Sequence, residues 1–241
     1  MRSSVLIGLT VFGIYLVIQI MRTQQLIKVG EKMAAETVAY TRHVEDPTFT
    51  ILFVGDSTAV GVGASTPEKS IAGLVANRYP AAEIVNNGVS GAKAVDVLEH
   101  IKQIDASYDL IMIHAGGNDV VRFTSLHDFR NSIRTILELA KQKAPQVLLT
   151  STGNVGTVPL FPAPTRWIFD RRSRSIRDIL IEEVARAGAT VRYTDLFRER
   201  PQDPFAEDPK TYYAKDQFHP SDAGYADWFS LMDVQLDQFT F

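Results

Sequence analysis

The chain has 241 residues, of which 45% are hydrophobic and 22% charged, and this composition is typical of a globular protein with a sizeable core. Its formal net charge of -3 gives no overall basic surface of the kind that binds nucleic acid, so nucleic acid is not expected as a partner. The absence of cysteine excludes a disulfide, a cysteine metal site and a thiol nucleophile, so any nucleophile is a different side chain.

The first residues differ in composition from the rest of the chain. Val5 to Met21 carries no charged side chain and resembles a membrane span, although its length is near the lower limit for a bilayer core. A cleaved signal peptide and a buried core helix are the alternatives, but no small-x-small cleavage site follows the segment and Arg22 comes directly after it. We therefore predict an uncleaved, single-pass membrane anchor over residues 1–22.

The side of the membrane on which the rest of the chain lies stays open. Arg22, Lys28 and Lys32 follow the apolar segment whereas Arg2 precedes it, and this charge bias favours a cytoplasmic domain. A short basic start before an apolar run is instead typical of an export signal, which favours a periplasmic or extracellular domain.

The remaining chain is predicted to form a helical stalk or lead-in over 23–47, based on the helix-forming composition of 23–43, and one globular domain over 48–241. In that domain, short apolar runs alternate with longer segments of helical periodicity. Strands are predicted at 51–54, 83–86, 109–114, 146–151 and 190–194, and helices at 70–78, 93–104, 126–143, 167–187 and after Pro220. This alternation predicts a mainly parallel five-stranded sheet with helices on both faces.

Polar turns follow the first three predicted strands. Gly55-Asp56-Ser57 follows the first, Asn87-Gly88 the second and Gly116-Gly117-Asn118-Asp119 the third. Since ligands bind beyond the carboxyl ends of parallel strands, we expect the three turns to meet at one rim. The chain lacks the nucleotide-binding patterns G-x-G-x-x-G and G-x-x-x-x-G-K-[ST] and the G-x-S-x-G elbow, so Ser57 needs a different context.

That context lies near the other end of the chain, where Asp216 and His219 stand three residues apart before a predicted helix. A D-x-x-H motif alone is more often a solvated turn, and a serine after a strand is more often a cap or turn residue. The combination with the polar rim favours a catalytic set, because a serine hydroxyl needs a base and the base needs a partner that fixes its tautomer.

Four ordered blocks of this sequence resemble the SGNH hydrolase superfamily, also called the GDSL lipase/esterase family. They are Gly-Asp-Ser-Thr at 55–58, Asn-Asn-Gly at 86–88, Gly-Gly-Asn-Asp at 116–119 and Asp-Gln-Phe-His-Pro at 216–220. The departure is Thr58, which stands where the family usually has leucine. The resemblance implies a flavodoxin-like three-layer α/β/α sandwich with strand order 2-1-3-4-5, and hydrolysis of an ester or related acyl bond.

The resemblance also implies a role for each matching residue. Ser57 is implied as the nucleophile, His219 as its general base and Asp216 as the carboxylate that orients the imidazole. The backbone N–H groups of Ser57 and Gly88 and the side-chain amide of Asn118 are implied as donors to the oxyanion. No metal and no cofactor are implied.

Two loops at the same rim are expected to carry the substrate pocket. They are residues 151–167 and the segment 200–215 before the catalytic pair. The expected lining residues are Val158, Leu160, Phe161, Trp167, Tyr212 and Tyr213. A proline-stiffened cover of the core is the alternative for 151–167. The nearby arginines at 166, 171, 172, 174 and 177 are more typical of a solvated helix face than of a site for anionic headgroups.

The sequence thus predicts a membrane-anchored serine esterase whose substrates are an acyl ester, lipid-derived or other, and water. One alternative is a deacetylase of a carbohydrate or cell-envelope polymer, for which a broad polar groove would be the distinguishing feature. A noncatalytic binding module on the same fold is the second alternative, and the intact Ser57, Asp216 and His219 count against it.

Overall fold

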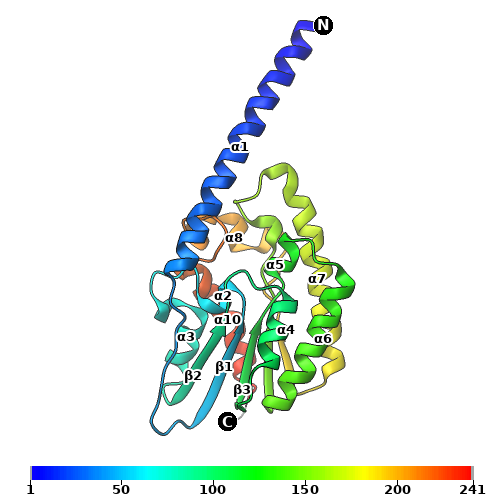
Figure 1. Cartoon of the computed structure of the whole chain (residues 1–241). Coiled ribbons are helices and arrows are strands. Elements are labelled where there is room, and N and C mark those ends of the chain that lie inside the picture. The colour runs from blue at the N-terminus through cyan, green and yellow to red at the C-terminus, as the bar shows by residue number, and fades with distance from the viewer. Residues whose placement is uncertain (1, 240–241) are drawn as a thin grey trace.

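The computed structural model describes residues 2–239, without the side chains of residues 2–8 and 11. At its centre is a five-stranded parallel sheet in the order β2-β1-β3-β4-β5 (Figure 1). The strands are β1 (Phe49–Gly55), β2 (Ala82–Gly88), β3 (Leu110–His114), β4 (Gln146–Thr150) and β5 (Val191–Thr194). The predicted strand order is confirmed.

Helices cover both faces of the sheet, as predicted for parallel strands joined by crossovers. On one face α3 (Ile71–Arg78) packs against α10 (Asp222–Leu236). On the other face α6 (Leu126–Lys143) lies between α4 (Ala94–Lys102) and α7 (Arg166–Ala187). The central strands β1 and β3 are almost fully buried, so the core lies on both sides of the sheet. The three-layer α/β/α sandwich is confirmed.

The strand order reverses at β1, whose two neighbours in the sheet are β2 and β3. The carboxyl ends of the three strands are in register, with Gly55 paired to both Gly88 and His114. Gly55 has φ of +155°, and a Cβ atom there would lie 2.3 Å from the carbonyl oxygen of His114. Glycine therefore allows β1 to turn away closely beside β3, at the position where open α/β sheets bind their ligands.

Several short helices follow the strands and were not predicted. They are α2 (Ser57–Val60), η1 (Pro67–Lys69), α5 (Gly117–Val121), η2 (Val155–Thr157), η3 (Ala163–Thr165), η4 (Arg200–Gln202), α8 (Pro204–Glu207) and α9 (Pro209–Tyr212). Side-chain caps begin several of them; for example, the carboxylates of Asp56 and Asp203 accept hydrogen bonds from the N–H groups of Thr58 and Phe205. Single turns have no hydrophobic periodicity, and so the sequence pattern did not reveal them.

The first helix, α1 (Arg2–Glu36), projects from the end of the body at which α2, α5 and α8 lie (Figure 1). The helix predicted over 23–43 therefore continues the apolar segment without a break and ends earlier. After it, Arg42 forms an antiparallel bridge with Ile84 and its guanidinium donates to the carbonyl of Ala76, so the body begins before residue 48.

The predicted membrane anchor over 1–22 finds no support in the described part of the chain. There, no helix has a stretch that is both long enough and apolar enough to cross a membrane. The side chains of residues 1–8 and 11 of the expected anchor lie outside the described residues.

Candidate active site

Ser57, His219 and Asp216 meet at the carboxyl end of β1. His219 Nε2 lies 2.8 Å from Ser57 Oγ, and His219 Nδ1 lies 2.5 Å from Asp216 Oδ2. All three residues are buried, Asp216 almost completely at 1% exposure. The three side chains therefore form a continuous hydrogen-bonded relay in the order expected of a nucleophile, a base and an orienting carboxylate.

The carboxylate of Asp216 is fixed by its own loop as well as by the imidazole. Its Oδ1 accepts hydrogen bonds from the backbone N–H groups of Phe218, at 3.0 Å, and of His219, at 3.1 Å. Burial acts to raise the pKa of Asp216, but the hydrogen bond and charge of His219, together with the two N–H groups, hold that pKa below its usual value. Asp216 is therefore ionised at neutral pH and directs Nδ1–H of the imidazole toward itself.

Ser57 is held at the start of α2 by the residue before it. Asp56 is the N-cap and accepts a hydrogen bond from the backbone N–H of Thr58 at 2.9 Å. The Asp56 side chain thereby stabilises the sharp turn from β1 into α2. The backbone N–H of Ser57 finds no acceptor among the described residues and stays available to a ligand.

The other two residues expected to donate to the oxyanion differ in their surroundings. Asn118 lies in the first turn of α5 (Gly117–Val121), and its Nδ2 donates one hydrogen to the carbonyl of Ala92 at 3.1 Å. The second hydrogen remains for a ligand, and Asn118 lines the same pocket as Ser57. Gly88 lies against α2, but its N–H donates to Asn86 Oδ1 at 3.0 Å and Gly88 does not line this pocket.

The pocket beside Ser57 has a volume of about 480 Å³, including solvent at its mouth. It is lined by Asp56, Ser57, Thr58, Gly117, Asn118, Thr152, Gly153, Asn154, Val155, Val158, Tyr213, Phe218, His219, Pro220 and Trp228. Two of the six side chains predicted to bind substrate, Val158 and Tyr213, are among them. The hydroxyl of Tyr213 lies 3.0 Å from Thr157 Oγ1, which fixes the ring in the pocket wall.

The structure does not bring the other four predicted side chains to this pocket. Leu160 is buried, and Phe161 stacks on Phe169 with ring centroids 4.1 Å apart, so both cover the core as the alternative interpretation proposed. Tyr212 packs against Phe205. Trp167 is 61% exposed at the start of α7 and points to solvent.

The loop after β4 supplies four pocket residues that were not predicted: Thr152, Gly153, Asn154 and Val155. They follow a strand end as the other polar turns do, so the same rule could have found them. Trp228 comes from the middle of α10, and nothing in the local sequence marks it as part of a site.

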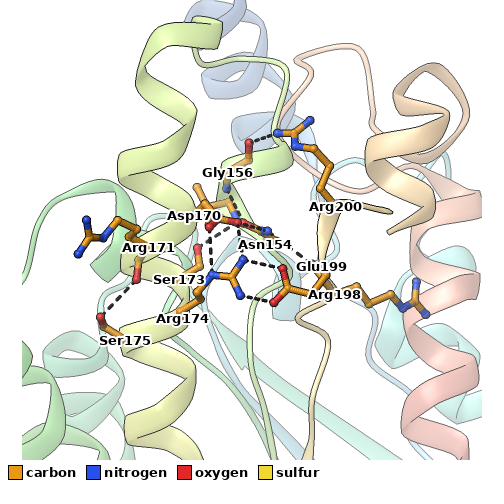
Figure 2. A network of polar contacts seen from close by, with 11 residues as sticks. Asn154, Gly156, Asp170, Arg171, Ser173, Arg174, Ser175, Arg198, Glu199 and Arg200 are labelled. Carbon is orange, nitrogen blue, oxygen red and sulfur yellow. Dashed lines mark hydrogen bonds and ion pairs between the residues drawn. The ribbon is translucent and has the colours of Figure 1, made fainter. Parts of the chain in front are cut away.

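A network of polar contacts holds this loop against α7 (Figure 2). Asn154 Nδ2 donates to Asp170 Oδ1 at 2.7 Å, and Asp170 in turn accepts from Arg174. Arg174 also bonds to Glu199 in the loop after β5. The network joins the loop after β4, α7 and the loop after β5, and it therefore fixes the polar wall of the pocket that contains Asn154.

The arginines of α7 are mostly engaged within the molecule. Arg174 pairs with two carboxylates, and Arg177 Nε lies 2.7 Å from Asp195 Oδ2. Arg172 donates to the carbonyl of Val120 and lies over the ring of Phe123. The cluster is thus a partly ion-paired helix face, in agreement with the simpler interpretation of its sequence.

No group of three or more His, Cys, Asp or Glu side chains in the described part of the chain is placed to hold a metal ion. The buried His114 does not line the pocket beside Ser57; its ring stacks on Trp228 at 5.9 Å between centroids, and burial lowers its pKa. His114 is therefore a neutral, packed side chain.

The fold is a three-layer α/β/α sandwich that gathers polar residues at the switch point of its parallel sheet, where open sheets of this kind bind their ligands. Residues 53–226 match the family model of the GDSL-like lipase/acylhydrolase family, and the chain belongs to that family. In a sequence comparison, no curated protein matches the chain.

Three solved structures with the same fold are similar to this chain at sequence identities of 15% to 22%. A lipolytic protein of the G-D-S-L family from Veillonella parvula is 16% identical with a TM-score of 0.63, covering 79% of this chain and 99% of its own. The esterase EstA from Pseudoalteromonas is 15% identical with a TM-score of 0.57, and the match covers 78% of this chain and 97% of EstA. The acetylxylan esterase Axe2 from Geobacillus stearothermophilus is 22% identical with a TM-score of 0.53, and the match covers 78% of this chain and 94% of Axe2. At these identities the likeness shows the shared fold.

Proposed function

We propose that this hydrolase is a serine esterase that cleaves an acyl ester through a covalent acyl-enzyme. The observation that carries the proposal is the relay from Ser57 Oγ through His219 to Asp216, with contacts of 2.8 and 2.5 Å. A serine hydroxyl becomes nucleophilic when a positioned base removes its proton, and the relay supplies that base in the required tautomer.

In the first half of the reaction Ser57 Oγ attacks the carbonyl carbon while its proton passes to His219 Nε2. In this scheme the carbonyl oxygen becomes an oxyanion, and the backbone N–H of Ser57 and the free hydrogen of Asn118 Nδ2 donate to it. When the tetrahedral intermediate collapses, His219 gives the proton to the departing alkoxide and the acyl group stays on Ser57. Water then enters and attacks the acyl carbon while its proton passes to His219. When this second tetrahedral intermediate collapses, the bond to Ser57 Oγ breaks, His219 returns the proton to Ser57 Oγ, and the acid leaves.

Gly88 can serve as a third donor to the oxyanion only if its present hydrogen bond is broken. Its N–H donates to the side chain of Asn86, so it reaches an oxyanion only if the bond to Asn86 is exchanged for one to the substrate. Asn86 Nδ2 is fixed to the carbonyl of Ala59 at 2.8 Å, which keeps the Asn86 side chain beside Gly88.

For the substrate, we propose an acyl ester whose acyl group meets the apolar part of the pocket wall. Val155, Val158, Phe218 and Trp228 supply that part, and Thr152 and Asn154 of the loop after β4 supply a polar part. A lipid-derived ester is the first candidate. The deacetylase alternative needs a small acyl group and a polar leaving group, which a panel of esters distinguishes.

We also propose that the N-terminal segment anchors the enzyme to a membrane. Val5 to Met21 carries no charged side chain in the sequence. In the described part of α1, large apolar side chains are exposed around the helix: Leu9, Phe12, Ile14, Leu16, Val17, Ile18, Ile20 and Met21. An apolar helix of this kind stabilises itself by contact with lipid rather than with water.

The test of the function is Ser57→Ala measured with a fluorophosphonate probe and a series of esters from acetyl to long-chain acyl groups. We expect the variant to keep its melting temperature, to lose labelling and to lose nearly all turnover. Labelling or turnover at the wild-type level in Ser57→Ala would refute the serine mechanism. In the wild type, a rate that rises with acyl length supports a lipid-derived substrate, whereas a rate restricted to acetyl esters supports the deacetylase.

A further inference from the structure

The two halves of α1 have different surroundings. Around Phe12 to Met21, almost every side chain is exposed on all sides of the helix. From residue 22 onward, half-buried positions recur at the spacing of one helix face: Arg22, Thr23, Leu26, Val29, Gly30, Met33 and Ala34. A stripe of this period lies against the body of a protein, so the second half of α1 is part of the packed structure.

The N-terminal end of this stripe, at Arg22, contacts two loops of the active site. Arg22 Nη2 donates to the carbonyl of Pro159 at 3.0 Å and to the side-chain oxygen of Gln217. The two loops also bond to each other, from the N–H of Leu160 to the carbonyl of Gln217 at 3.0 Å. Arg22 therefore ties the loop that carries Asp216 and His219 to the loop that carries Val158.

Two turns further along, α1 meets the triad itself. A Cβ atom built on Gly30 would lie 3.0 Å from Asp216 Oδ2, the same oxygen that accepts the hydrogen bond from His219 Nδ1. A contact this short is tighter than side chains normally make, so a methyl group here would push the carboxylate or the helix by about a few tenths of an ångström. Glycine is the residue that lets the backbone of α1 lie directly against Asp216.

We propose that Gly30 is a positioning residue for the triad, and that residues 22–37 form part of the active site. The backbone of α1 at Gly30 covers Asp216 Oδ2, so that water does not compete with His219 for it. The proposal rests on the proposed serine mechanism. It adds to the family fold, because the matching family model begins at residue 53 and α1 lies outside it.

The helix offers a matched control for this proposal. Gly13 also lies in α1, and a Cβ atom built there would meet nothing within 4 Å. Alanine is a better helix former than glycine, so helix propensity alone predicts that Gly30→Ala and Gly13→Ala both leave the fold as stable as before or more stable. A difference in activity between the two variants therefore comes from the packed contact at Gly30 and not from helix propensity.

The experiment measures kcat, KM and Tm of the full chain carrying Gly30→Ala or Gly13→Ala, with a reactive ester as substrate. We expect Gly13→Ala to match the wild type. We expect Gly30→Ala to lose about tenfold in kcat with little change in KM, because a shift of about 1 Å in a catalytic group can cost about 10²-fold and this shift is smaller. Unchanged kcat in Gly30→Ala would overturn the proposal.

A double-mutant cycle with Asp216→Ala then shows whether Gly30 acts through that carboxylate. In the Asp216→Ala background the new methyl group has nothing to displace, so we expect Gly30→Ala to cause no further loss. A loss of the same factor in both backgrounds would overturn the proposal, whether or not Tm falls. Ser57→Ala separates this outcome from failure of the mechanism: if Ser57 is essential and Gly30→Ala is silent, the inference alone fails.

Discussion

His219 Nε2 lies 2.8 Å from Ser57 Oγ although 162 positions of the chain separate the two residues. Ser57 is placed by the end of β1 and the cap of α2, whereas His219 is placed by the loop before α10. Because α10 packs beside α3 and the sheet, the two halves of the site meet only when the whole sandwich is assembled. The contact between Ser57 and His219 therefore forms only when the complete tertiary fold has formed.

Asp216→Asn is expected to lower kcat by about 10³–10⁴ with a small effect on KM. The amide cannot reliably accept the bond from His219 Nδ1–H, so the imidazole loses the tautomer that leaves Nε2 free to take the proton. The backbone bonds to Oδ1 can survive the change, so Tm should change little. Initial rates with a reactive ester, beside a thermal melt, check this; a folded variant within tenfold of the wild type would contradict the role.

Asn118→Ala tests the oxyanion donor that a simple Ser/His/Asp set would not supply. Loss of the amide is expected to lower kcat by about 10²–10³ and to leave KM nearly unchanged, because the donor acts on charge that appears only in the transition state. The variant also loses the bond to Ala92, so its melting temperature is measured alongside. Unchanged kcat in a folded protein would remove Asn118 from the oxyanion site.

Glu183→Gln is expected to destabilise the fold without affecting the chemistry. The Glu183 side chain is 1% exposed and accepts hydrogen bonds from Arg134 at 2.9 and 3.0 Å and from Arg130 at 3.0 Å. Loss of these charge-assisted bonds should cost about 1.5–3 kcal/mol in the free energy of unfolding. The neighbouring Glu182→Gln, at an exposed position, is the control and should cost much less.

The same site predicts a pH dependence of stability. The hydrogen bonds from Arg134, with further help from Arg130, hold the pKa of Glu183 below its usual value. A lowered folded-state pKa means that the stabilisation is present above the unfolded value, about 4.3, and is lost as pH falls through the lowered value. Wild-type Tm should therefore fall more steeply below about pH 4.3 than Tm of Glu183→Gln; parallel curves would contradict the assignment.

The membrane proposal is tested by comparing the full chain with one that begins at Arg22. The full chain is expected in the membrane fraction and the shorter chain in the supernatant, because only the first contains the apolar segment. The shorter chain keeps the stripe from Arg22 to Thr37 and should retain its kcat. Full-length, uncleaved protein that stays in the supernatant would refute the anchor.

Much of the fold could be predicted because its signals are local and repeated. The buried strands are continuous apolar runs, and α6 and α7 have the bounds expected from helical periodicity to within one residue. The rest of the pocket was harder. Thr152 and Asn154 follow a strand end, which is a local signal, and they enter the site because β4 ends beside β3. Trp228 enters because α10 packs against the same loop, and nothing in the local sequence marks that contact.

By itself, the sequence determined the alternation of strands and helices, the polar turns at strand ends, and the four blocks that contain Ser57, Gly88, Asn118 and His219. These depend on the period of side chains along the chain and on residue chemistry, which are written in the order of amino acids. The tertiary structure decided that Val158 and Tyr213 face the pocket while Trp167 points to solvent, and that Gly30 lies on Asp216. Such contacts depend on how whole elements pack in three dimensions. In a close-packed interior the position of each side chain depends on all of its neighbours, and these come together only in the folded chain.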